Sequence, residues 1–347
     1  MSEEPRSDAA LHELLLRLAG NAADELIAGT RDQLAAGRLN NAARMVAACA
    51  ESGRFRPTDA DLRLLTALEP ALDAVEIRAA AERAGKDVAG VGWEFAPAIP
   101  VPGAPALVAL DLTAGDETPV AADAAAASAA ERQEGTVALW RAWRAPDELN
   151  PEIGRVYLLE TTAAAAELPQ ITAALHTELR AAGLEEPQVE VFRPDTDLPW
   201  YQRKARGRSA LLWAAAPAAP VTIARDFDAV DPQDGPAFEP NHERLSEHEA
   251  ARVLDYLDSG EALLATTARE HDILDSALGE VVPQSFRTDG TWIWTDTVTY
   301  YLRVYGLAPD QDLLAHIRRR DYRIAALDDV SRHRALVELF RPVDQPS

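Results

Sequence analysis

Apolar positions at the start of the chain repeat with a helical period. Leu11, Leu14, Leu15 and Leu18 recur at spacings of three and four residues, which places them on one face of a helix. Similar apolar faces follow as far as Gly85, and the run Pro57-Thr58-Asp59 is typical of a helix start. Several short helices with short connections predict an antiparallel bundle over residues 9–85.

The next fifty residues change in composition. Residues 86–135 contain closely spaced prolines, and residues 121–130 are almost all alanine. Proline breaks regular structure, whereas alanine favours helix but offers little surface to bury. We therefore predict a Pro/Ala-rich connector over residues 86–135, with the alanine run as either a helix or a flexible link.

Residues 136–216 alternate between strand-like and helix-like segments. A helical face over 168–182 separates β-branched and aromatic runs that are typical of strands. The strands are expected at 136–143, 155–162, 188–192 and 209–215. This order predicts a central α+β module with a helical layer on a mixed sheet. The Pro- and Asp-rich residues 217–245 then predict a second connector or an ordered surface loop.

The last module, residues 246–341, is organised around a hairpin and the helix after it. Asp289-Gly290 predicts a type I′ turn, because Gly adopts positive φ without a steric penalty. Val298, Tyr301 and Leu302 then share one helical face, and Gly306 fits the position that ends a helix. The expected fold class is therefore α+β, an N-terminal helical bundle followed by two small α+β modules.

Aromatic and charged residues of this hairpin and helix form the first candidate binding site. Trp, Tyr and Arg are the residue types that dominate binding hot spots. The candidate residues are Arg287, Asp289, Trp292, Trp294 and Tyr301. The alternative interpretation is that the aromatic side chains belong to the core, since aromatic residues also dominate core burial.

A second candidate site lies between the last two strands of the central module. Trp200, Tyr201 and Arg203 open a short segment rich in Lys and Arg. Basic residues beside aromatic ones can bind phosphate or single-stranded nucleic acid. The alternative is a solvated segment whose arginines pair with the acidic surface around them.

Charge and composition narrow the class of partner. The net charge of −23 makes nucleic-acid binding unlikely, because phosphate contacts need clustered Lys and Arg, and it favours a basic protein partner. No apolar run is long enough to span a membrane, so we expect no membrane partner. The single cysteine, Cys49, sits among apolar residues and excludes an internal disulfide, which fits a cytoplasmic location.

The sequence contains no recognisable catalytic or cofactor motif. No HExxH, CxxC, Gly-x-Ser-x-Gly or Gly-rich phosphate loop occurs. Asp226, Asp228, Asp231 and Asp234 do not follow the EF-hand spacing, so neither a metal nor another cofactor is predicted. An enzyme of unrecognised class stays an alternative, with His271, Asp272, Arg287 and Asp289 around one cleft.

The stretch Ser285 to Ile317, SFRTDGTWIWTDTVTYYLRVYGLAPDQDLLAHI, resembles a segment that recurs in a multi-module protein family of high-GC bacteria. The runs RVYLLETT and QVEVFRPDTDLPWYQRKARGRSALLWA are similar to parts of the same family. The resemblance implies a modular architecture and transfers no catalytic residue.

The leading function is a non-enzymatic interaction or regulatory protein, such as an acidic immunity or adaptor protein. A self-associating structural protein is a third possibility.

Overall fold

The computed structural model describes residues 7–84, 92–101, 103, 106–113, 120–148 and 150–341. Its mixture of helices and strands confirms the α+β class. Contacts divide the chain into two units, unit 1 from Met1 to Pro217 and unit 2 from Ala218 to Ser347. Within the described ranges, no helix is both long enough and apolar enough to cross a membrane.

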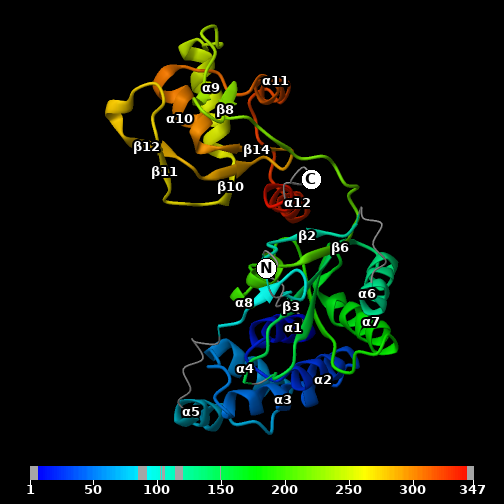
Figure 1. Ribbon diagram of the computed structural model, residues 1–347. Coiled ribbons are helices and arrows are strands. Elements are labelled where there is room, and N and C mark those ends of the chain that lie inside the picture. Colours follow the sequence, from blue (N-terminus) through cyan, green and yellow to red (C-terminus); the bar gives the residue numbers. More distant parts are fainter. Residues whose placement is uncertain are drawn as a thin grey trace. The chain divides into compact units, whose positions relative to one another are not determined.

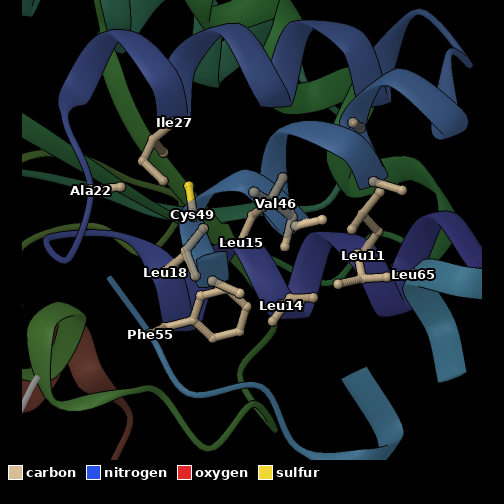
Figure 2. Packing of buried hydrophobic residues seen from close by; sticks show 14 of the residues in the cluster. Leu11, Leu14, Leu15, Leu18, Ala22, Ile27, Val46, Cys49, Phe55 and Leu65 are labelled. Atoms are coloured by element: carbon tan, nitrogen blue, oxygen red, sulfur yellow. The ribbon is translucent and has the colours of Figure 1, made fainter. Parts of the chain in front are cut away.

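Unit 1 begins with a group of helices that share one apolar core (Figure 2). Thr58 caps the fourth of them, because its hydroxyl accepts the Asp61 N–H while the Asp61 carboxylate accepts the Thr58 N–H. Cys49 is buried in this core, and burial raises the pKa of its thiol to about 11, so the thiolate is disfavoured. The helices are α1 (Ser7–Leu18), α2 (Asp24–Ala35), α3 (Leu39–Glu51), α4 (Asp59–Leu68) and α5 (Ala74–Ala84).

A six-stranded mixed sheet forms the rest of unit 1. Its strand order is β2-β6-β3-β4-β5, and β1 pairs with the far end of β3. The strands β3 and β4 form an antiparallel pair, whereas β4 and β5 are parallel and are joined through helix α7 (Leu168–Ala181). The strands are β1 (Phe95–Ala96), β2 (Leu110–Asp111), β3 (Thr136–Arg144), β4 (Gly154–Thr161), β5 (Gln188–Phe192) and β6 (Ala210–Ala214).

Helices cover both faces of this sheet. Figure 1 shows α7 beside α6 (Ala121–Arg132), and both pack on the face that carries Val189 and Val191. The opposite face carries Glu190, which contacts α2 and the short helix α8 (Trp200–Arg206). Because α1 and α2 pack against α7 and β5, the N-terminal helices and the sheet belong to one unit.

The alanine-rich run is helix α6 and is part of the core of unit 1. Ala126 and Ala130 are fully buried, and their small side chains let the helix lie close to α7 and the sheet. Asp123 of α6 accepts hydrogen bonds from Arg141 and from the Tyr157 hydroxyl. The described part of the range 86–135 therefore contributes α6, β1 and β2 to a folded unit and is not a connector.

Unit 2 builds a smaller core around helix α9 (Glu247–Ser259) and the sheet β10-β13-β14-β7. The range 217–245, predicted as a connector or ordered loop, supplies β7 to this sheet and the hairpin β8–β9. The strands are β7 (Thr222–Ile223), β8 (Ala229–Asp231), β9 (Gly235–Ala237), β10 (Glu261–Leu264), β11 (Arg269–His271), β12 (Glu280–Pro283), β13 (Phe286–Thr288) and β14 (Trp292–Thr295). The remaining helices are α10 (Asp296–Tyr305), α11 (Gln311–Arg319) and α12 (Asp329–Leu339).

The turn of the central hairpin differs from the prediction. Thr288 pairs with Ile293, and the Asp289 N–H donates to the Trp292 carbonyl, so Gly290 and Thr291 are the central residues. A type I′ turn centred on Asp289-Gly290 requires positive φ at both residues. Gly290 has φ +87°, but among the described residues other than glycine only Asp321 and Tyr322 have positive φ. The prediction of a type I′ turn was therefore wrong. The reason is the Asp289 carboxylate, whose Oδ1 accepts the Thr291 and Trp292 N–H groups at 2.8 Å each.

Candidate functional site: an acidic pocket with an aromatic wall

Unit 2 contains a pocket of about 310 Å³ between the segment before β8, the segment after β9, and helix α10. Its lining combines aromatic rings with carboxylates, a combination that suits a positively charged group. The lining residues are Arg225, Asp226, Phe227, Asp228, Phe238, Glu239, Asn241, His242, Glu243, Val298, Tyr301, Ala308, Pro309, Asp310 and Gln311.

Three aromatic side chains form one wall of the pocket. The ring centroids of Phe227 and Phe238 lie 5.3 Å apart, and each lies within 5.8 Å of the Tyr301 ring. These rings meet at steep angles, the arrangement that aromatic quadrupoles favour. Tyr301 is buried on α10, and its hydroxyl accepts the Ile273 N–H at 3.1 Å. The wall is therefore built from the segment before β8, the segment after β9 and helix α10.

Arg225 and His242 of the pocket already have partners within unit 2. Arg225 Nε donates to Asp310 Oδ2 at 2.8 Å. The His242 ring lies between two acceptors, Asp228 Oδ2 at 2.8 Å from Nδ1 and the Ala308 carbonyl at 2.9 Å from Nε2.

Asp226 and Asp228 lie two residues apart in different environments. Burial alone would raise the pKa of Asp228, but the Glu239 N–H and the His242 ring outweigh burial and hold this pKa below its usual range. Burial raises the pKa of Asp226, and the hydrogen bond from the Thr295 hydroxyl, 2.5 Å long, does not offset it. Asp226 has no positively charged partner among the described residues.

The first predicted site lies mostly in the core of unit 2. Trp294 is fully buried, with Nε1 donating to the Leu257 carbonyl, and Trp292 lies beside the His316 ring. Arg287 pairs with Asp296 at 2.7 Å. Of the five predicted residues, Tyr301 is the one that lines the pocket. These positions agree with the core interpretation of the hairpin aromatics, which the sequence had left open.

Asp289, also in the first predicted site, is a buried acceptor shared by several elements. Its Oδ2 accepts the Tyr256 hydroxyl of α9 at 2.5 Å and faces Nε2 of His316 on α11 at 2.6 Å. Burial alone would raise the pKa of this carboxyl, but the Tyr256 hydroxyl and the backbone N–H groups outweigh burial and lower it. The residue joins the turn of the hairpin to two helices.

The second predicted site divides into a surface part and a core part. Trp200 is 62% exposed, and the Arg203 guanidinium lies 5.8 Å from its ring and 3.8 Å from Asp197. Tyr201 is buried, and its hydroxyl accepts Nη1 of Arg144 at 3.1 Å. The two aromatic neighbours therefore do not present one continuous surface.

The four residues of the enzyme alternative have separate partners. His271 lies 3.6 Å from Glu280 on the exposed β11–β12 pair, and Asp272 accepts the hydroxyls of Tyr300 and Tyr305. Arg287 and Asp289 have the partners described above. None of the four is paired with another in the described part of the chain, so the observed contacts do not bring them to one cleft. Within the described ranges, no group of three or more His, Cys, Asp or Glu could hold a metal ion.

The pocket is not predicted by any sequence motif, although part of its lining is recognisable in the sequence. The Pro- and Asp-rich composition of residues 217–245 predicts a connector or an ordered surface loop, and the spacing of the aspartates was compared only with that of calcium ligands. Asp231 instead accepts the Gln233 and Asp234 N–H groups in the β8–β9 turn. Phe227 and Phe238 within this polar run were the available signal, because aromatic side chains have a large apolar surface that is favourable to bury.

No family model, curated protein or solved structure matches this chain.

Proposed function

We propose that this chain is a non-enzymatic interaction protein, of the immunity or adaptor kind, that binds a basic protein partner through unit 2. The observation that carries the proposal is local charge. Residues 218–284 contain fifteen Asp and Glu, four Arg and no Lys. Such a strongly one-signed segment attracts a partner of opposite charge and accelerates its approach at low ionic strength.

The four arginines of this segment are engaged within unit 2. Arg225 and Arg252 pair with Asp310 and Asp321. Arg244 and Arg269 donate to the backbone carbonyls of Tyr305 and Val281. The positive groups are therefore held in place by local contacts and do not neutralise the remaining carboxylates.

Several carboxylates of the same segment are left for a partner. Asp234, Glu239 and Glu247 are exposed and have no ion-pair partner among the described residues. An exposed carboxylate is well solvated, so a single one contributes little to affinity, whereas several of them on one unit add up to a substantial field. The proposal places the protein in the cytoplasm, the compartment that its one buried cysteine fits.

A charge-matched comparison tests the proposal. The probe is a short peptide of alternating arginine and serine, titrated calorimetrically at low and at high salt. We expect binding to wild type that weakens with salt, and about tenfold weaker binding to Asp234→Asn/Glu239→Gln/Glu247→Gln.

The control variant, Glu13→Gln/Glu51→Gln/Glu76→Gln, removes the same charge from exposed positions of unit 1 and is expected to bind almost as tightly as wild type. The absence of peptide binding would reject the proposal. An equal loss in both variants would reject the assignment to unit 2. A mass measured across the micromolar range in the same experiments tests self-association.

A further inference from the structure

The pocket of unit 2 contains one half-buried carboxylate that lacks a positive partner among the described residues. Arg225 is paired with Asp310, and His242 with Asp228. Glu243, at the rim, accepts Arg318 at 3.2 Å. After these pairs are formed, Asp226 is the half-buried carboxylate of the pocket that lacks a positive partner among the described residues.

An unpaired carboxylate in a partly dry site is unfavourable until a cation approaches it. The Thr295 hydroxyl fixes the orientation of Asp226, so a cation that enters would find one acceptor oxygen already positioned. The rings of Phe227, Phe238 and Tyr301 can attract the same cation by their π faces and cover the methylene groups that carry it.

The size of the pocket limits what can fill it. A volume of about 310 Å³ lies at the lower end of the range for small-molecule sites and suits one long side chain better than a cofactor. We infer that this pocket receives a single cationic side chain, arginine or lysine, from the basic partner, and that Asp226 forms the ion pair with it. The inference rests on the proposed function and adds a defined anchor to a surface otherwise described only by charge.

Of the two side chains, arginine has the chemistry that matches more of the pocket. Its planar guanidinium stacks on aromatic faces and donates in several directions, so it can contact Asp226 and the ring wall together. Lysine offers a compact charge that can pair with Asp226 but has no planar group to stack on the rings. The shared property is a side-chain cation, and the experiment separates the two sources.

The test follows backbone amide signals of the full chain by NMR while N-acetyl-arginine methylamide is added. We expect saturable shifts at Phe227, Phe238 and His242, smaller shifts with the lysine analogue, and none with the neutral citrulline analogue. The variant Asp226→Asn should bind the arginine analogue about tenfold more weakly, while Glu51→Gln, which removes one negative charge from an exposed position of unit 1, should bind as wild type does.

The outcomes separate this inference from the proposed function. If the arginine-serine peptide binds but Asp226→Asn binds the arginine analogue as wild type does, the pocket inference fails and the acidic interaction surface stands. Equal binding of citrulline and arginine analogues also overturns it, and this arm needs no variant that must fold. If neither peptide nor analogue binds wild type, both proposals fail.

Discussion

The two units bury carboxylates in different ways. In unit 1, Glu190 on β5 faces the Arg31 guanidinium of α2 at 2.6 Å, and both side chains are at most 2% exposed. In unit 2, Asp289 accepts two backbone N–H groups and the Tyr256 hydroxyl, with the His316 ring as a further partner. The buried charge of Glu190 is thus balanced by an opposite charge, and that of Asp289 mainly by neutral donors.

The two arrangements differ in how many buried polar atoms they leave without a hydrogen-bond partner. Arg31 Nε and Nη1 and Glu190 Oε1 are buried without a hydrogen-bond partner among the described residues, although Gln202 also donates to Glu190. Both oxygens of Asp289 accept hydrogen bonds. Charge pairing holds distant segments together at a high desolvation cost, whereas a carboxylate that accepts several neutral donors satisfies its hydrogen-bonding capacity locally.

The largest effect is expected from breaking the charged pair of unit 1. Glu190→Gln should lower the free energy of unfolding by about 4 kcal/mol, because it leaves the Arg31 charge buried without its counter-ion. The double variant Arg31→Met/Glu190→Leu should recover most of this loss, since replacing both charges by apolar side chains removes the desolvation penalty. Native-state hydrogen exchange of the β5 amides measures the free energy of unfolding of both variants. A loss below about 1 kcal/mol in the single variant would contradict the comparison.

Removing the acceptor of unit 2 should have the next largest effect. Asp289→Ala is expected to cost about 3 kcal/mol, because buried donors on the turn and on α9 lose their acceptor. Asp231→Ala is the matched control, since Asp231 also accepts two backbone N–H groups in a turn but is exposed and has no tyrosine or histidine partner. Hydrogen exchange of the β14 amides measures the loss of stability in Asp289→Ala. Similar losses in the two variants would show that burial and the helix contacts contribute nothing.

Acidification should weaken unit 1 through its buried histidines. Burial lowers the pKa of His12 to about 4 even though its Nε2 bonds the Val191 carbonyl, and burial also lowers the pKa of His176, whose Nδ1 faces Asp32. The unfolded chain takes up a proton near pH 6.5, so the stabilisation is complete above that pH and is lost as the pH falls toward 4. The loss from His12 alone should reach about 2 to 3 kcal/mol.

Urea unfolding at pH 7 and pH 4.5 checks this pH dependence. The variant His12→Gln cannot titrate, and its amide can still donate to the Val191 carbonyl, so its stability should fall less than that of wild type over this interval. Carboxyl groups with a lowered pKa, such as Asp61, affect stability only at lower pH, which keeps the two contributions apart. The same pH dependence in wild type and variant would exclude His12 as its source.

Local signals in the sequence predicted individual elements well. Gly306 ends α10 in the left-handed conformation with φ +70°, as its place after the apolar face predicted. Val298, Tyr301 and Leu302 of that helix are buried as expected. Such features depend on residues a few positions apart, and the backbone geometry of helix ends is set locally. The α+β class followed from the same signals.

The hairpin shows where local rules fail. Asp-Gly favours a type I′ turn, but Asp289 Oδ1 accepts the Thr291 and Trp292 N–H groups while Oδ2 meets Tyr256 and His316, and the turn is centred one residue later. The alanine-rich residues 121–130 also show that local rules do not predict tertiary contacts. Their sequence could not reveal that α7 and the sheet would cover them.

The sequence by itself determined the fold class, the positions and ends of most helices, the excess of negative charge and the burial of Cys49. The tertiary structure decided which polar residues meet. Arg31 and Glu190 are 159 positions apart, and the pocket joins Asp226, Phe238 and Tyr301 from separate segments. The physical reason is that the cost of burying a charge, and the pKa of a carboxyl such as Asp226, depend on neighbours that only the folded chain brings together.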